Sequence, residues 1–336
     1  MINREIIRIK IVQLTYAYYQ NGNKNIDSAE KELFFSLSKA YDLYNYLLGL
    51  IVAVTKEAEK RYEVALSRAK REGIAEPSQK FAFNRFAIQL SENKQLQEFM
   101  STQKISWEDS SAYLGQLFEK IEQSDIYQDY MKSDEDSYEA DRELWRKLYK
   151  TFIQNDEELD SILEDQSLYW NDDKEIVDTF VLKTIKRFNE QDGSKMELLP
   201  EWDSDEEKDF ARKLFRSAIL NADEYQRYMS EASRNWDFSR LAYMDIILMQ
   251  IAIAEMMTLT SVPISVTINE YVELAKLYST SKSSGYINGM LDTIARNLVD
   301  TGRLLKHMDP PKEKAKKDMA PKVKMRPRIK KTKKED

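Results

Sequence analysis

The chain has 336 residues, enough for one large domain or two ordinary ones, and carries a formal net charge of −7. It has no cysteine and a single histidine, His307, which excludes disulfides, thiolate metal sites, a cysteine nucleophile and any site that needs several histidines. Glycine (8) and proline (7) are scarce while 32% of residues are charged, so the composition favours an all-α protein.

The apolar stretches are too short for a membrane span. The longest dense run, residues 46–54, is far below the roughly 20 residues that a helix needs to cross a bilayer. The first residues show no hydrophobic segment followed by a small-residue cleavage site, so we expect no signal peptide. Together with the absence of cysteine, these features predict a cytoplasmic protein with no membrane association.

Residues 2–20 are predicted to form the first helix. Apolar residues recur along it at helical spacing: Ile7, Ile11, Leu14 and Tyr18. Arg4 and Arg8 lie one turn apart and off this stripe, with Lys10 nearby, so we expect both guanidinium groups to point the same way. This face is either a solvated cationic surface or a short edge that binds nucleic-acid phosphates.

The middle of the chain is predicted to be helical after a turn at residues 21–25. Residues 33–70 read as one long helix, broken at residues 73–77, and further helices are expected at 81–100, 110–129, 137–153 and 173–188. The large aromatic residues here are expected to be mostly core, with an interface as the alternative for some: Trp107, Tyr113, Phe118, Trp145 and Trp170.

A break at residues 191–202 precedes two further helices. The first carries a stripe at Phe210, Leu214, Ala218 and Ile219. The second, over residues 239–257, is apolar nearly all round, which is typical of a central buried helix.

Residues 262–298 predict a helix, a polar loop and a second helix beginning at Tyr286. Thr267 and Glu270 have the spacing of a capping box, although Pro263 would equally suit the first turn of a longer helix. Gly289 lies inside the second helix, where glycine costs roughly 1 kcal/mol relative to alanine. We expect another helix to pack closely against it.

The loop at residues 279–285 combines hydroxyl groups, a lysine and a glycine before a helix start. Such a group suits an anion such as an RNA phosphate. The alternative is that its serines only cap the second helix.

The end of the chain is basic. Residues 311–336 contain 12 Lys and Arg against 4 Asp and Glu, a net charge of +8, which leaves −15 for the rest. We predict a disordered tail, which is either a solvated terminus or a sequence-independent RNA arm.

No recognisable catalytic arrangement is present. A histidine triad is excluded, and neither a phosphate-binding P-loop nor a dinucleotide-binding glycine turn occurs. We therefore predict no enzymatic activity, no cofactor, no metal site and no small-molecule substrate.

Four segments carry a resemblance to a known family. Residues 268–276 (I-N-E-Y-V-E-L-A-K) and 286–292 (Y-I-N-G-M-L-D) closely resemble the C-terminal signature of the NusB family of bacterial transcription antitermination factors. Residues 11–16 (I-V-Q-L-T-Y) stand where the family has its first-helix motif. The helix over 239–257 matches through Arg240, Asp245, Leu248, Ala252 and Glu255.

The resemblance implies a helical fold of two small bundles and a function in binding RNA without catalysis. The implied partners are boxA-type RNA, the ribosomal protein NusE and the RNA polymerase antitermination complex that supports ribosomal RNA transcription. From the resemblance and from their chemistry, the expected RNA-binding residues are Arg4, Arg8, Lys10, Gln13, Lys282, Ser283, Ser284, Gly285, Tyr286 and Asn288. Lys282 stands where the family often has an acidic residue. The expected NusE-binding residues are Tyr16, Arg240 and Asp245.

The domain organisation that follows has four parts. Residues 1–20 form the first NusB-like helix, 21–202 a helical insertion, 203–306 the C-terminal NusB-like bundle and 307–336 the basic tail. The alternative function is a helical protein-interaction scaffold that has only non-specific RNA affinity, through its tail.

Overall fold

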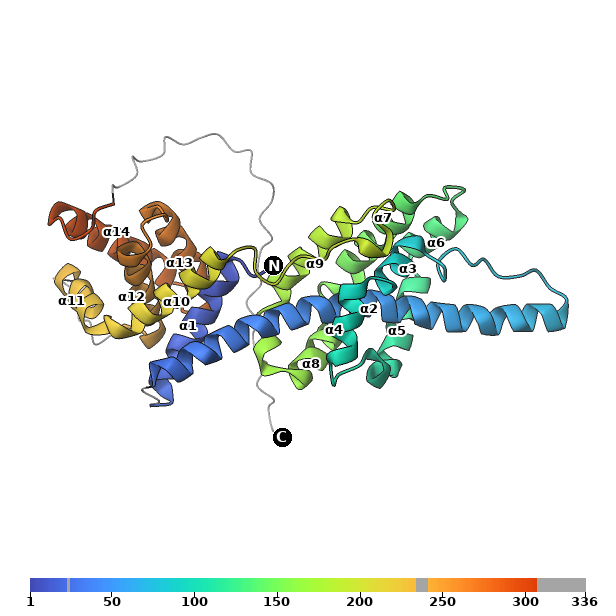
Figure 1. Cartoon of the computed structure of the whole chain (residues 1–336), viewed down its shortest axis with the longest axis horizontal. Helices are drawn as coiled ribbons and strands as arrows, with labels where there is room; N and C mark the ends of the chain where they lie inside the picture. Colours follow the sequence, from blue (N-terminus) through green and yellow to red (C-terminus); the bar gives the residue numbers. More distant parts are fainter. Residues whose placement is uncertain (23–24, 234–240, 307–336) are drawn as a thin grey trace. The chain divides into compact units, whose positions relative to one another are not determined.

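The structure, a computed structural model, describes residues 1–22, 25–233 and 241–306. These residues form α-helices and a few short 3-10 and π turns, and the described part of the chain has no strand, as expected for an all-α protein (Figure 1). The helices are α1 Arg4–Gln20, α2 Ile26–Glu72, α3 Arg85–Ser91, α4 Lys94–Thr102, α5 Ser111–Glu122, α6 Asp125–Lys132, α7 Tyr138–Leu148, α8 Glu157–Gln166, α9 Lys174–Arg187, α10 Asp205–Leu220, α11 Ala222–Ala232, α12 Tyr243–Thr258, α13 Ile264–Tyr278 and α14 Ser283–Asp300.

The chain divides into two compact units, which we describe separately. Unit 1 contains residues 1–6 and 34–203, and unit 2 contains residues 7–33 and those from 204 onward. The division falls within α1 and α2, so each of these helices supplies residues to both units. Within the described ranges, every helix is too short or too polar to span a bilayer.

Unit 1 has an aromatic core built on the middle of α2. The ring of Tyr46 stacks on Trp107 and Trp170, with ring centroids 4.2 and 5.4 Å apart. The indole Nε1 of Trp107 donates a hydrogen bond to the backbone oxygen of Tyr46, at 2.9 Å. A Cβ added to Gly49 would lie 3.0 Å from Sδ of Met100, so glycine permits this close approach. The five aromatic residues predicted to be core are all buried.

The helices of unit 1 follow the predicted pattern with two extra breaks. The long helix expected over residues 33–70 is confirmed within α2. The stretches 81–100 and 110–129 each form two helices, because Asn93 and Ser124 act as N-caps inside them. The Asn93 side chain accepts from the amide of Leu96 and Ser124 from that of Tyr127, which satisfies donors at a new helix start.

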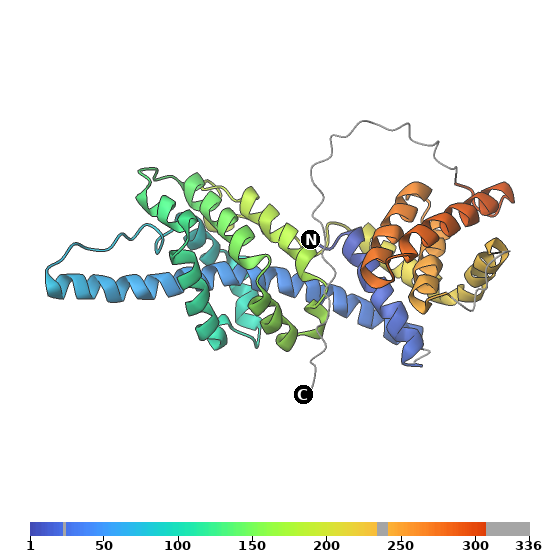
Figure 2. The same cartoon turned by 180° about the vertical axis from the view of Figure 1, so that it is seen from behind.

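Unit 2 is organised around α12, as predicted for a central buried helix. This helix packs against α10, α11, α13 and α14 (orange to red for α12–α14 in Figure 2). Every residue from 247 to 256 is buried. The one neutral polar side chain among them, Gln250, donates to the backbone oxygen of Ala218 and to the Tyr19 hydroxyl, both at 2.8 Å. The buried amide of Gln250 thus has hydrogen-bond partners, as buried polar groups usually do.

The start of α13 agrees with the alternative of a longer helix that begins near Pro263 and not with the capping box at Thr267 and Glu270. The helix begins at Ile264 with Pro263 as its N-cap residue, one turn before Thr267. Because Thr267 lies within the helix, its hydroxyl is directed to Glu255 on α12 instead of to a backbone amide, at 2.8 Å. The following helix, α14, begins at Ser283, three residues before the predicted Tyr286.

Candidate nucleic-acid interface

The loop between α13 and α14 is braced by a buried carboxylate. Asp245, in the first turn of α12, is 5% exposed. Its Oδ2 accepts a hydrogen bond from the Ser283 hydroxyl at 2.9 Å, and its Oδ1 accepts one from Ser279. Thr280 and Ser283 share a further hydroxyl–hydroxyl bond of 2.8 Å. Both ends of the loop are thereby fastened to α12.

The outer edge of the same segment is open. Lys282, Gly285 and Asn288 are exposed, while Ser284 and Tyr286 are half-buried. A Cβ placed on Gly285 or Gly289 would meet no atom within 4 Å. Positions 285, 288 and 289 share one face of α14, so a ligand can approach its backbone there. The prediction that another helix packs against Gly289 is wrong, because this residue faces outward.

Two residues of α1 were predicted to bind RNA together with this loop. Gln13 lies next to the last turn of α13, and Arg4 is the first residue of α1. The Gln13 amide donates to the Tyr278 hydroxyl at 3.0 Å, which joins α1 to the last turn of α13. Arg4 begins α1 and is half-buried. The structure therefore brings Gln13 next to the helix that leads into the loop, with its amide already engaged.

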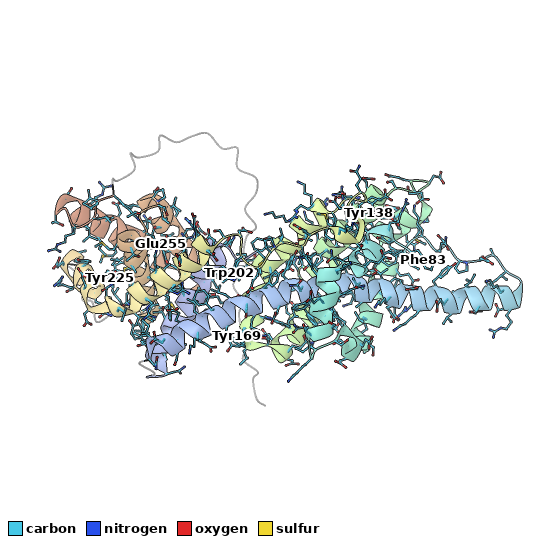
Figure 3. The ribbon with its side chains drawn as sticks, viewed as in Figure 1. Phe83, Tyr138, Tyr169, Trp202, Tyr225 and Glu255 are labelled. Atoms are coloured by element: carbon cyan, nitrogen blue, oxygen red, sulfur yellow. The ribbon has the colours of Figure 1, made fainter. Side chains whose placement is uncertain are left out.

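Arg8 is an interior residue, in contrast to the prediction. It is 4% exposed and forms a two-pronged ion pair with Glu255 of α12, with Nε–Oε2 and Nη2–Oε1 distances of 2.8 and 2.9 Å. Thr267 and Tyr271 of α13 also donate to this carboxylate, the latter at 3.2 Å. Figure 3 shows Glu255 among the helices of unit 2. The cluster joins α1, α12 and α13 through one carboxylate.

The opposite charges of Arg8 and Glu255 stabilise each other in this cluster. Burial opposes the charge of Arg8, but the hydrogen bonds and negative charge of Glu255 outweigh this effect and raise the pKa of the guanidinium. Burial, together with the adjacent Glu255 charge, also raises the pKa of the Tyr271 hydroxyl, which stays protonated as a donor.

The prediction that Arg8 and Lys10 are surface phosphate contacts is therefore corrected, because both side chains are buried. Lys10 is 2% exposed, and residues 6–12 are buried without interruption. Helical spacing put Arg8 off the apolar stripe, but α1 is surrounded over this stretch, so no outward face exists there. Ser283 is buried as well, and its hydroxyl serves the brace.

Of the three residues expected to bind NusE, one is exposed, one is buried and one lies outside the described residues. Tyr16 is 39% exposed and packs edge-on against Tyr243, which is 43% exposed, with ring centroids 5.9 Å apart. Asp245 is buried, so the prediction that it contacts a partner at the surface is corrected. Its carboxylate instead holds the loop between α13 and α14. Arg240 lies outside the described residues.

Sequence reasoning did not identify Tyr243, Ser279 or the Arg8–Glu255 pair. A signal existed for the pair: Glu255 is an acid within the apolar stretch of α12 that follows Gln250, and a buried carboxylate needs a cation or several donors. Among the described residues, no group of His, Cys, Asp and Glu side chains is arranged to hold a metal ion.

Replacement of Arg8 tests the buried pair. Arg8→Met leaves the Glu255 carboxylate buried without its cation, so we expect the free energy of unfolding to fall by about 3–5 kcal/mol. Urea titration followed by circular dichroism measures this change. The control is Arg296→Met, which breaks an exposed ion pair with Asp292 and is expected to cost about 1 kcal/mol or less. Equal costs for the two variants would refute the buried-pair assignment.

The brace is tested by Asp245→Ala. Removal of the carboxylate leaves the hydroxyls of Ser279 and Ser283 without their acceptor, so local opening becomes easier. We expect amide hydrogen exchange over residues 279–286 to accelerate by about tenfold or more, since a loss of about 1.4 kcal/mol of hydrogen-bond free energy corresponds to that factor. Asp292→Ala, which removes an exposed carboxylate of α14, should leave these amides protected. Unchanged protection in Asp245→Ala would contradict the brace.

Comparison with known proteins gives a consistent set of relatives. Residues 178–296 match the model of the NusB family. The Transcription antitermination protein NusB of Geotalea daltonii is 36% identical over 135 residues, which cover 40% of this chain and 90% of that protein. The protein of the same name from Salinibacter ruber is 33% identical over 132 residues, covering 38% and 82%.

Two further matches are partial or weak. The NusB protein of Chloroherpeton thalassium is 43% identical over 99 residues, but the chain spans only 47% of its length and 30% of its own. The solved structure of T. maritima NusB is 29% identical to this chain and covers 35% of this chain and 82% of that chain, with a TM-score of 0.27.

The family is not one of enzymes, and the predicted absence of catalytic activity agrees with it. The 36% identity across nine-tenths of a NusB relative, together with the family match at residues 178–296, establishes that this chain belongs to the NusB family.

Proposed function

We propose that the protein is a transcription antitermination and elongation factor that binds boxA-type RNA together with NusE and supports ribosomal RNA transcription. The observation that carries the RNA part is the open edge of α14. There Lys282, Gly285 and Asn288 are exposed at the start of α14, next to the loop that Asp245 holds in place. A pre-arranged loop loses little conformational entropy on binding.

Chemistry at this edge is suited to RNA. Lys282 supplies a positive charge next to the N-terminal end of α14, where the helix dipole is also positive, and both favour a phosphate. Asn288 carries an amide that can donate to and accept from base edges in single-stranded RNA. Arg4, Gln13, Ser284 and Tyr286 complete the proposed contact set, with Arg8, Lys10 and Ser283 in supporting interior positions.

The proposed NusE surface is the aromatic pair of Tyr16 and Tyr243. Exposed tyrosines are enriched at protein interfaces because they bury a large area at small entropic cost. The domain assignment is likewise a proposal: residues 1–20 and 203–306 form the NusB-like part, residues 21–202 are an insertion and residues 307–336 are a basic tail.

One observation favours the alternative function, a scaffold with only non-specific RNA affinity through its tail. Arg8 and Lys10 are buried, so the first helix offers fewer cations than its sequence suggests. The two functions differ in where the RNA binds and in whether binding depends on RNA sequence.

RNA binding distinguishes them. We expect the full chain to prefer a boxA RNA over a scrambled RNA at two salt concentrations, with tighter binding when NusE is present. A version ending at Met308 should retain this preference. Binding that ignores sequence, disappears with added salt and requires the tail would support the scaffold instead.

A single substitution locates the site. Lys282→Glu replaces an exposed cation with an anion, so affinity for boxA RNA should fall about fivefold to tenfold, as expected for the loss of a phosphate contact. Lys213→Glu makes the same charge change at an exposed position of α10 and should have a much smaller effect. Equal losses in the two variants would argue against the α14 edge.

The partner surface is tested with Tyr16→Ala and Tyr243→Ala. Each removes half of an exposed aromatic pair, so we expect the dissociation constant for NusE to rise about tenfold. Titration calorimetry measures this change. Val266→Ala removes an apolar side chain of similar exposure, 40%, and should bind NusE normally. Normal NusE binding by both tyrosine variants would exclude this surface.

A further inference from the structure

Unit 1 contains a groove outside the site described above. It lies between α7 and α9, which run side by side in both views (Figures 1 and 2). Its volume is about 330 Å³, and its lining residues are Arg142, Glu143, Arg146, Ile185 and Lys186. Tyr138, labelled in Figure 3, marks the beginning of α7.

Cations dominate the outer surface of these two helices and of the turn after α7. Seven exposed or half-buried cationic side chains occur there: Arg142, Arg146, Lys147, Lys150, Lys183, Lys186 and Arg187. In the described part of the chain, none of the four lysines makes an ion pair. Only Glu139, Glu143 and Glu175 oppose them on the exposed surface of the same helices.

The other acids of α7 and α9 face the interior of unit 1. Asp141 is 3% exposed and accepts from the Tyr130 hydroxyl at 2.6 Å. Asp178 is fully buried and accepts from the Tyr149 hydroxyl and from Nζ of Lys174, at 2.6 and 3.0 Å. The outer surface of α7, of α9 and of the turn after α7 therefore carries seven cations against three carboxylates, in a chain whose net charge is −7.

The groove walls are held in place by local contacts. Nη1 of Arg142 donates to the backbone oxygen of Phe188 at 2.6 Å, which fastens α7 to the end of α9. Glu143 binds Arg146, with an Nε–Oε2 distance of 2.7 Å. Lys183 and Lys186 are one turn apart on α9, and Lys147, in the last turn of α7, has the same spacing from Lys150 in the turn that follows. Lys186 lines the groove, and the other three lysines lie on the elements that form its walls.

We propose that this groove binds the phosphate backbone of RNA, as a second and sequence-independent contact beyond the α14 edge. The proposal rests on the proposed RNA-binding function of the chain. Lysines that are not paired attract a polyanion by releasing its counterions, and phosphates are the dense negative charges of RNA. No aromatic side chain lines the groove, so it offers no stacking platform for bases and favours the backbone.

The test uses the full chain with Lys183→Glu combined with Lys186→Glu. Fluorescence anisotropy measures binding to a short boxA RNA and to the same RNA with a single-stranded extension. We expect the double variant to lose about tenfold in affinity for the extended RNA and to show a salt dependence reduced by about 0.7 per lost contact. Binding of the short RNA should be unchanged.

The matched control is Lys56→Glu with Lys60→Glu, the same charge change at exposed positions of α2 in unit 1. Lys147→Glu with Lys150→Glu is an independent second variant, which should reproduce the loss if the groove binds RNA. Circular dichroism identifies any variant that fails to fold. Equal affinities of all three double variants for the extended RNA would overturn the proposal.

Two further outcomes separate the hypotheses. If the wild type shows no boxA preference, the proposed function fails, yet a loss confined to the two groove variants still supports an RNA-binding groove. If polyglutamate displaces the extended RNA as effectively as an unlabelled RNA of equal charge, the groove recognises acidic polymers in general and its assignment to RNA is overturned.

Discussion

Unit 2 depends on the pairing of one buried carboxylate. Glu255 lies in α12, the helix that contacts most of the unit, and it accepts hydrogen bonds from Arg8 of α1 and from Thr267 and Tyr271 of α13. A charge in such a position is tolerated only when its lone pairs are satisfied. The requirement fixes the rotation of α1 and α13 about α12. It also turns Arg8 away from solvent, which leaves the exposed edge of α14 as the principal candidate surface for RNA.

Much of the fold was predictable because the pattern of apolar residues indicates where a helix runs and which of its faces is buried. The uninterrupted apolar character of α12 predicted its central position, and the long periodic stretch in α2 predicted one continuous helix. The breaks at Asn93 and Ser124 were missed because a single capping side chain changes the local backbone without altering the surrounding hydrophobic pattern.

The candidate site was less predictable because its residues act through tertiary contacts. Periodicity assigned Arg8 to an exposed face, whereas residues 6–12 are buried all round. Asp245 matched a surface contact by position, but it binds two hydroxyls that are more than thirty residues away in sequence. No local sequence pattern predicts a contact between residues so far apart in the sequence. Lys282, Gly285 and Asn288 are exposed, as residues of loops and polar helix faces usually are, and their role in RNA binding stays a prediction.

The two candidate RNA surfaces use different chemistry. At the α14 edge, exposed backbone and few side chains permit a close and oriented approach, which suits selective contacts. Along α7 and α9, flexible lysines offer charge without a fixed hydrogen-bond pattern, which suits a contact that tolerates any sequence. Selectivity and additional affinity are thereby assigned to separate units of one chain.

The Asp245 brace also connects two surfaces of unit 2. Tyr243 precedes Asp245 by two residues in the first turn of α12, so the exposed aromatic pair and the loop anchor share one helical turn. A ligand that shifts this turn at one of the two proposed surfaces would change the binding free energy at the other. Thermodynamic linkage requires the change in affinity to be equal in both directions. A carboxylate that is only 5% exposed would thus couple the affinities of the two proposed sites.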